Sequence, residues 1–266
     1  MTSFDDHERD RWAGRAEAYR RSFALLCAYP VDALLDAAAV GPGGRVLDAG
    51  CGTGTVAARA AGRGATVVAV DAEASMLALA RRAVPDARPV RAALPRLPVA
   101  GAAVDAAVAN FVVNHVGDPA AAVAELRRTV RPGGRVAVTT WPYPQPPLQA
   151  LWGAVFAGVA GGDLPRVPAD RDFARTEAGL AGLLVRAGLT DVRCATLTWT
   201  HRADPDDWWS GPASGLGVPG LLLQRQSPAV RDRLRRRYDE LGAAHRDDDG
   251  RLALPTAALL ASGAVG

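Results

Sequence analysis

Residues 46–54 read VLDAGCGTG, and this stretch constrains the fold of the chain more than any other. An apolar run with room for one short buried strand ends in an acid and leads into a glycine-rich turn. Glycine lacks a Cβ and tolerates positive φ, so the backbone of such a turn can approach a ligand closely. The helix expected from about Thr55 would direct its N-terminal amides at whatever the loop holds. The pattern therefore predicts a strand–loop–helix unit with a ligand at the loop.

The glycine spacing and the preceding acid narrow the choice of ligand. Dinucleotide-binding enzymes carry G-x-G-x-x-G here, whereas Gly50, Gly52 and Gly54 follow G-x-G-x-G. Asp48, two residues before the first glycine, would repel a pyrophosphate but suits a ligand with a cationic amino acid end. We expect Asp48 to pair with that end directly or through water, a role compatible with capping the turn. An NAD(P)-dependent oxidoreductase is the less favoured alternative.

Strands and helices alternate along the chain, which is the βαβ pattern of a parallel sheet covered on both faces. Strands are expected at 44–49, 66–70, 87–92, 104–109, 134–140, 190–200 and 252–261. Helices are expected at 55–63, 73–84, 118–131, 148–160, 177–187 and 228–244, with two more in 5–39 separated at Pro30 and a Trp-containing turn before 228. Asp118 and Pro119 are a typical helix start, and Gly188 a typical helix end. The order predicts an α/β, Rossmann-like, doubly wound seven-stranded sheet, mostly parallel with an antiparallel last strand.

The block 46–54 resembles the first motif of the class I S-adenosylmethionine-dependent methyltransferases, and the resemblance continues over roughly residues 40–140. Asp71 ends the second strand 21 residues beyond Gly50, near where nucleotide-binding folds place an acid that accepts from ribose hydroxyls. Residues 104–115 resemble the fourth strand and the segment under the methionine end of the cofactor. Residues 131–138 resemble the turn and fifth strand that follow. The resemblance implies S-adenosyl-L-methionine as cofactor and methyl transfer to an O, N or C nucleophile.

On this reading residues 1–266 form one methyltransferase domain with helical cap insertions. Its parts are N-terminal helices and cap (1–40), a cofactor-binding core (41–141), cap or substrate insertions (142–175 and 203–247), and a final strand and tail (248–266). The hydrophobic fraction, 49%, is enough for a full core.

The resemblance also implies the cofactor contacts, which are Tyr19, Asp48, Gly50, Cys51, Gly52, Gly54, Asp71, Ala72, Met76, Ala93, Leu94, Asn110 and Phe111. Cys51 would pack in the loop and not act as a nucleophile. Ala93 departs from the family, whose members often carry an Asp there that accepts a bond from the adenine amino group. One lost neutral hydrogen bond costs about 1 kcal/mol. The departure leaves open a non-methylating relative that binds the cofactor or another small ligand as a scaffold or regulator.

Aromatic residues and one histidine are the candidates for contacting the methyl acceptor. Trp12, His115, Trp141, Tyr143 and Trp208 form this set, and the aromatic rings favour an apolar acceptor that could be planar. Trp12 and Tyr19 lie seven apart on the first expected helix and so share a face. His115 is the candidate catalytic residue, because imidazole changes charge near neutral pH and could take a proton from the acceptor. A structural histidine is the alternative.

Composition disfavours other classes of partner and site. All 31 basic residues are arginine, balanced by 28 acids to a net charge of +3, which gives little support for a nucleic-acid partner. The sequence after the fourth strand, NFVV, is not the Asn/Asp-Pro-Pro-aromatic motif of nucleic-acid amino methylases. Three scattered cysteines and the DDDG turn at 247–250 predict no metal site. The N-terminus lacks an apolar signal core and no run could span a bilayer, so we expect a cytoplasmic enzyme acting on a small molecule, such as a secondary metabolite. The oligomeric state is not predicted.

Overall fold

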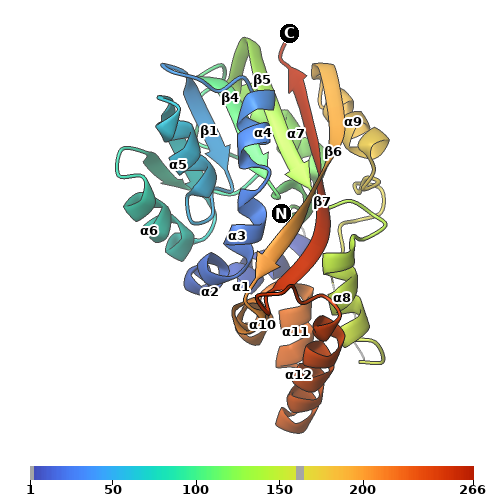
Figure 1. Cartoon of the computed structure of the whole chain (residues 1–266). Coiled ribbons are helices and arrows are strands. Elements are labelled where there is room, and N and C mark those ends of the chain that lie inside the picture. Colours follow the sequence, from blue (N-terminus) through green and yellow to red (C-terminus); the bar gives the residue numbers. More distant parts are fainter. Residues whose placement is uncertain (1–2, 160–164) are drawn as a thin grey trace.

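The computed structural model describes residues 3–159 and 165–266, and a seven-stranded sheet runs through the middle of this part of the chain (Figure 1). The strands are β1 (Arg45–Ala49), β2 (Thr66–Asp71), β3 (Arg88–Arg91), β4 (Val104–Asn110), β5 (Val130–Thr140), β6 (Thr190–Ala203) and β7 (Leu252–Ala264). Their order is β3-β2-β1-β4-β5-β7-β6, and β1 to β5 pair in parallel. β7 is antiparallel to both of its neighbours, β5 and β6. The predicted doubly wound sheet with an antiparallel last strand is confirmed.

Helices cover both faces of this sheet. They are α1 (Ser3–Trp12), α2 (Ala16–Arg21), α3 (Phe23–Ala28), α4 (Val31–Ala37), α5 (Thr55–Gly62), α6 (Ala74–Ala83), α7 (Pro119–Thr129), α8 (Pro147–Val155), α9 (Glu177–Arg186), α10 (Pro205–Ala213), α11 (Gly217–Gln224) and α12 (Pro228–Ala243), with a short 3₁₀ turn η1 (Val113–His115). Along β1, Leu47 and Ala49 join the core under α7 and α9, whereas Val46 joins the core under α4, α5 and α6. Burial on both faces explains why the central strands are apolar runs without alternation.

The N-terminal region differs in part from its prediction. The break at Pro30 is confirmed, but the segment before it forms three helices instead of one. Gly14 adopts a φ of +70° just after α1, and Ser22, with φ −120° and ψ −85°, separates α2 from α3. Trp12 and Tyr19 therefore lie on different helices and do not share a face of one helix.

Some helices after β5 also differ from their predicted bounds. Helices α10 and α11 replace the predicted Trp-containing turn, because Asp204 caps α10 by accepting from the backbone N–H of Asp206 at 2.8 Å and of Asp207 at 3.1 Å. α8 ends at Val155, before the predicted residue 160, which itself lies outside the described residues. The predicted caps hold, since Asp118 accepts from the Ala121 N–H at 2.9 Å and Gly188 has a φ of +84°.

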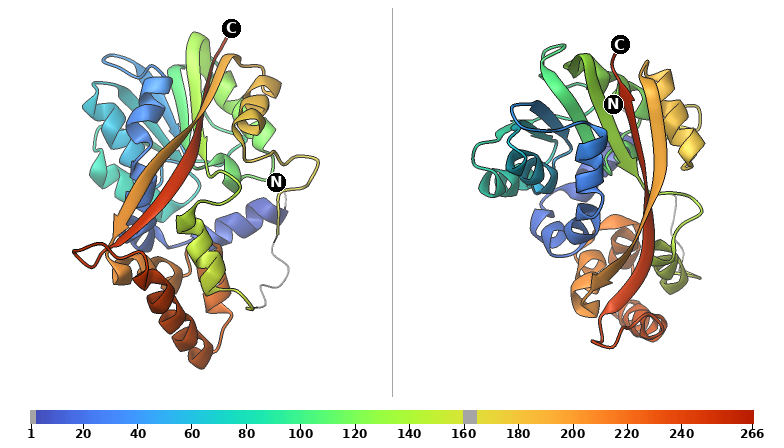
Figure 2. Two further views of the ribbon diagram at one scale, coloured as in Figure 1. Left: turned by 45° about the vertical axis from the view of Figure 1, so that its right-hand side comes forward. Right: turned by 45° about the horizontal axis from the view of Figure 1, so that its top comes forward.

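β6 and β7 continue past the carboxyl edge of the parallel strands as a two-stranded ribbon (Figure 2). Thr140, the last residue of β5, pairs with Leu259, so residues 252–258 of β7 extend beyond it. This extension packs against α8, α10 and α12 around Trp152, Trp208 and Tyr238. The ribbon thus supports a helical layer at the edge where parallel sheets bind ligands.

Candidate active site

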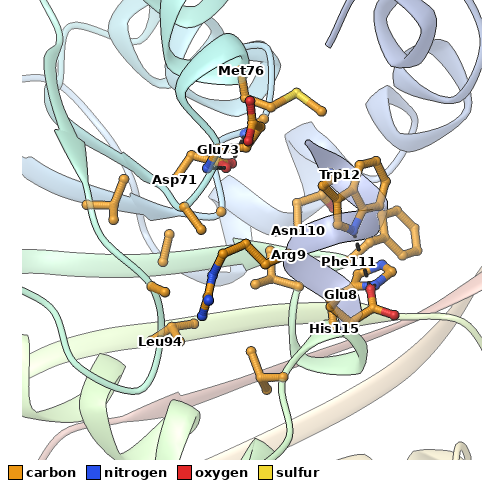
Figure 3. A pocket seen from close by; sticks show the side chains of 18 of the residues that line it. Glu8, Arg9, Trp12, Asp71, Glu73, Met76, Leu94, Asn110, Phe111 and His115 are labelled. Atoms are coloured by element: carbon orange, nitrogen blue, oxygen red, sulfur yellow. Dashed lines mark hydrogen bonds and ion pairs between the residues drawn. The ribbon is translucent and has the colours of Figure 1, made fainter. Parts of the chain in front are cut away.

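A cavity of about 290 Å³ lies at the carboxyl ends of β1, β2, β3 and β4 (Figure 3). One side is built by Gly50 and Gly52 after β1, residues 71–76 after β2 and residues 92–94 after β3. The helices α1 to α3 close the other side, and Trp141 and Gly217 complete the wall. The volume is at the lower end of the range for small-molecule sites.

The glycine loop is shaped by two positions at which a side chain would not fit. Gly50 has a φ of +71°, and a Cβ added there would lie 2.4 Å from Cγ2 of Val112. Gly54 has a φ of +91°, and its Cβ would lie 2.9 Å from the Cα of Ala80 in α6. Gly50 therefore lets the loop lie close to Val112, whereas Gly54 lets α6 pack against the start of α5.

Asp71 ties this loop to the end of β2. Its Oδ2 accepts from the Gly52 N–H at 2.8 Å and its Oδ1 from the Glu73 N–H at 2.9 Å. Burial raises the pKa of Asp71, while these two backbone N–H groups act in the opposite direction. Each carboxylate oxygen keeps a lone pair after one such bond, so Asp71 can still accept from ligand hydroxyls in the cavity that it lines.

Asp48 lies behind the loop and is completely buried. Neither of its carboxylate oxygens has a hydrogen-bond partner among the described residues. Burial, with the charge of Asp71 added to it, raises the pKa of Asp48 to about 7. Two carboxylates beside one loop, one of them buried, favour a cationic ligand group and oppose a pyrophosphate.

Ten of the expected cofactor residues line the cavity, namely Tyr19, Gly50, Gly52, Asp71, Ala72, Met76, Ala93, Leu94, Asn110 and Phe111. Asp48, Cys51 and Gly54 lie behind its wall. Glu73 also lines it and was missed by the sequence analysis. Its Oε1 accepts from the Ser75 N–H at 3.0 Å, the pattern of an N-cap, and an acid just before the helix start was the available signal.

Helix α1 brings a second missed acid, Glu8, against His115 (Figure 3). Oε2 of Glu8 is 2.6 Å from Nδ1 of His115 and accepts from Nε1 of Trp12 at 3.3 Å. The Arg11 guanidinium donates to the other carboxylate oxygen. Trp12 meets the His115 ring edge-on at a centroid distance of 5.4 Å. Nothing in the sequence distinguishes Glu8 from the other charged residues of α1, because its partner is more than a hundred positions away.

An aromatic pair lies beside this acid–histidine contact. The rings of Phe111 and Trp141 stack with a centroid distance of 3.9 Å and an interplanar angle of 19°. Phe111 has a φ of +56°, and its N–H donates to Oγ1 of Thr139 at 2.9 Å. That hydroxyl donates to Oδ1 of Asn110 at 2.7 Å, and the Asn110 amide donates to the Cys27 carbonyl at 2.8 Å. A non-glycine residue held in this conformation is typical of functional sites.

Trp12, His115 and Trp141 of the expected acceptor residues line the cavity, whereas Tyr143 and Trp208 do not. Tyr143 lies in the proline-rich loop after β5 and is 69% exposed. Trp208 is 1% exposed, because its indole packs between Phe23, at 4.9 Å, and Trp152, at 6.2 Å, in the apolar interior of the cap.

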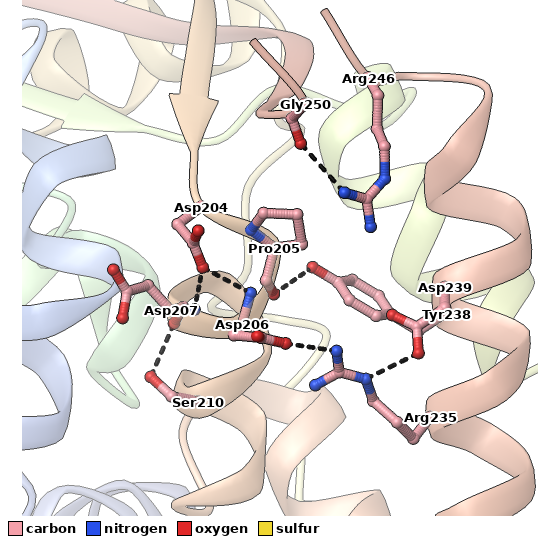
Figure 4. Close-up of polar contacts among 10 residues, drawn as sticks. All are labelled: Asp204, Pro205, Asp206, Asp207, Ser210, Arg235, Tyr238, Asp239, Arg246 and Gly250. Carbon is pink, nitrogen blue, oxygen red and sulfur yellow. Dashed lines mark hydrogen bonds and ion pairs between the residues drawn. The ribbon is translucent and has the colours of Figure 1, made fainter.

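Polar contacts join α10 to α12 in this cap (Figure 4). Arg235 pairs with Asp206 and with Asp239, and the Tyr238 hydroxyl donates to the Pro205 carbonyl at 2.8 Å. The other arginines of α12, Arg231, Arg233, Arg236 and Arg237, are exposed. These residues hold the cap together and do not reach the cavity.

Within residues 3–159 and 165–266, no group of three or more His, Cys, Asp or Glu side chains is arranged to hold a metal ion. None of the helices described there has the length and apolar character needed to cross a membrane.

Comparison with known proteins identifies the domain. Residues 47–138 match a family model described as "Methyltransferase domain". With the seven-stranded sheet, this match confirms the predicted class I methyltransferase resemblance.

Relatives match part of the chain. A demethylmenaquinone methyltransferase of Beutenbergia cavernae is 39% identical over 122 residues, which is 46% of this chain and 51% of the relative. A malonyl-[acyl-carrier protein] O-methyltransferase of Enterobacter lignolyticus is 36% identical over 143 residues, 53% of this chain and 57% of the relative. The chain thus spans about half the length of these relatives.

Solved structures share the fold over most of the chain. The YcgJ protein of Bacillus subtilis superposes with a TM-score of 0.56 at 19% identity, covering 89% of this chain and 97% of that one. A geranyl diphosphate C-methyltransferase of Streptomyces coelicolor, solved with S-adenosyl-L-homocysteine, gives a TM-score of 0.51 at 19% identity, covering 88% of this chain and 78% of that one.

Proposed function

We propose that the chain is an S-adenosylmethionine-dependent methyltransferase that acts on a small molecule. The observation that carries the proposal is the cavity whose glycine loop is flanked by a buried carboxylate, Asp48, and a half-buried one, Asp71. The methyltransferase domain match over residues 47–138 and a fold relative solved with S-adenosyl-L-homocysteine support it.

The residues of the cavity suit the parts of this cofactor. Asp71 would accept from the ribose hydroxyls, and Ala93 and Leu94 would contact the adenine. Asp48 and the loop at Gly50 would face the cationic amino acid end. The bound cofactor supplies an electrophilic methyl group on sulfonium, so the protein has mainly to align the acceptor with it and exclude water. α1 covers the cavity and contributes to this exclusion.

The acceptor is proposed to be an apolar small molecule of the secondary-metabolite kind. The two relatives named above act, by their names, on different acceptors, demethylmenaquinone and malonyl-[acyl-carrier protein]. Their similarity spans about half of each chain, so neither acceptor is assigned to this chain. The support for an apolar acceptor is the wall formed by Trp12, Phe111 and Trp141.

Titration calorimetry tests the proposal. We expect micromolar-range binding of S-adenosylmethionine and of S-adenosyl-L-homocysteine, and no binding of NAD. Tight binding of NAD alone would support an oxidoreductase and contradict the proposal. Cofactor binding without methylated product from a broad panel of small acceptors would instead favour the scaffold or regulator that Ala93 leaves open.

A further inference from the structure

We propose that Glu8 is a positioning residue that makes His115 the base for an acceptor hydroxyl carried on a planar, apolar ring. This inference rests on the proposed methyltransferase function and names the acceptor class for the same site.

The contact between the two residues fixes which nitrogen of His115 carries a proton. The Glu8 side chain is 5% exposed, and its Oε2 lies 2.6 Å from Nδ1 of His115. Burial alone would raise the pKa of Glu8, but the hydrogen bonds from His115 and Trp12, with the charge of Arg11, bring it below its usual value. An ionised carboxylate can only accept, so Nδ1 of His115 must donate to it.

The other nitrogen is then available as a base. In the neutral ring a proton on Nδ1 leaves Nε2 with a lone pair. The His115 side chain lines the cavity and is 28% exposed, and the structure gives its Nε2 no hydrogen-bond partner among the described residues. When Nε2 takes a proton, the Glu8 carboxylate stabilises the imidazolium that forms.

Other charged side chains line the same cavity as Glu8 and His115. They are Asp5, Arg9 and Arg11 on α1, and Asp71 and Glu73 after β2. Asp5 accepts from the Gly117 N–H at 2.6 Å, so α1 is anchored at two points to the segment that carries His115. The structure gives the imidazole a hydrogen bond to Glu8.

The shape of the wall and the presence of a base together select the acceptor. The stacked pair of Phe111 and Trp141 and the edge of Trp12 offer flat apolar surfaces to a ring. A hydroxyl on an aromatic ring, with a pKa of about 10 in tyrosine, stays neutral at physiological pH and must lose its proton to become a good nucleophile. A carboxylic acid is already ionised there and needs no base, so the Glu8–His115 pair favours the hydroxyl.

The step balances without a further reagent. The acceptor O–H bond breaks and its proton moves to Nε2 of His115. The oxygen electron pair forms the bond to the methyl carbon, and the pair of the broken carbon–sulfur bond remains on sulfur. The proton on His115 then passes to solvent.

A coloured phenol tests the inference without turnover. 4-Nitrophenol absorbs at longer wavelength when ionised, so its spectrum reports whether a bound molecule has lost its proton. The protein is first saturated with S-adenosyl-L-homocysteine and then titrated with 4-nitrophenol at a pH where the free phenol is neutral. We expect the bound phenol to be ionised in the parent and in Glu17→Gln, a matched control on an exposed acid of α2. It should be neutral in His115→Gln and Glu8→Gln.

Turnover of phenols that the enzyme accepts gives the second readout. Glu8→Gln should lower kcat roughly 10-fold or more, with the acceptor KM changed less than threefold. Glu8→Asp, which keeps a carboxylate, should recover part of the loss. S-adenosyl-L-homocysteine affinity, measured in every variant, reports whether the site is still folded.

The outcomes separate this inference from the proposed function. Failure of the parent to bind S-adenosyl-L-homocysteine overturns the proposed function. Three outcomes overturn the role of Glu8 and the hydroxyl assignment when S-adenosyl-L-homocysteine binds normally: the phenol does not bind, it binds in its neutral form, or it is equally ionised in Glu8→Gln. The methyltransferase proposal stands in each case.

Discussion

Asp48 and Asp71 are acids of the same type, close together, yet their surroundings differ. Asp71 accepts two backbone N–H groups and lines the cavity, whereas Asp48 is buried without a partner among the described residues. Both acids could be predicted as site residues from their spacing to the glycine loop, because each lies at the end of a strand next to that loop. Glu8 could not be predicted, since its role depends on a contact with His115 made across the fold.

Asp71→Ala should weaken S-adenosylmethionine binding by about 1–3 kcal/mol, because removing an acceptor leaves donors of the ligand and of the loop unpaired. Calorimetric titration measures the loss, and Asp86→Ala, on an exposed turn, is the control. Unchanged affinity in Asp71→Ala would show that the ribose assignment is wrong.

Ala93→Asp should leave cofactor affinity unchanged or strengthen it by up to about 1 kcal/mol, because the new carboxyl could accept a bond from adenine. The same titration checks this. A large loss of binding in a variant that melts like the parent would show that Ala93 packs tightly against the base.

Asp48 makes the stability of the ligand-free protein depend on pH. Its pKa rises from 3.8 to about 7 on folding, so its ionised form destabilises the fold. The penalty is absent below about pH 4, grows as the pH rises towards 7 and is complete above it. Asp48→Asn should therefore stabilise the ligand-free protein at pH 8 by up to about 4 kcal/mol, and by much less at pH 4.5.

Urea unfolding of Asp48→Asn and the parent at both pH values measures this difference. The same variant should bind S-adenosylmethionine more weakly at pH 8, because the carboxylate that faces the ligand cation is lost. A variant that is no more stable than the parent at pH 8 would mean that Asp48 is stabilised by contacts other than those described.

At the scale of elements, the sequence predicted the helix ends that depend on neighbouring residues. Asp118, Pro119 and Gly188 mark helix ends as expected, because caps and left-handed turns need only neighbouring residues. The break of the first helix at Gly14 was missed, since a single glycine within a helical pattern is often tolerated. α10 and α11 were missed because the apolar interior of the cap, not a clear periodicity, stabilises them.

The glycine loop offers a matched pair of substitutions at this scale. Gly54→Ala should destabilise the fold by at least about 2 kcal/mol, because φ is +91° and the new Cβ would lie 2.9 Å from Ala80 in α6. Gly62→Ala, at the other end of α5 with nothing within 4 Å of its Cβ, should stabilise it by up to about 1 kcal/mol. Urea denaturation compares them, and equal stabilities would contradict the packing described for the loop.

The whole molecule combines a predictable core with a less predictable cap. The sheet order, the antiparallel β7 and the ligand edge follow from the alternation of strands and helices along the chain. The cap was predicted as an N-terminal segment and two insertions. Of the aromatic residues expected at the acceptor, Trp12 and Trp141 line the cavity and Tyr143 and Trp208 do not. Trp141 lines the cavity and Trp208 is buried because the β6–β7 ribbon and α8 enclose the latter, and no periodicity in the sequence shows this.

A crystal structure with S-adenosyl-L-homocysteine bound tests the central claim most directly. We expect the ribose hydroxyls at Asp71, the purine beside Ala93 and Leu94, the ammonium group at the Asp48 side of the glycine loop, and the sulfur facing His115. A ligand bound elsewhere, or one whose ribose lies away from Asp71, would contradict the account.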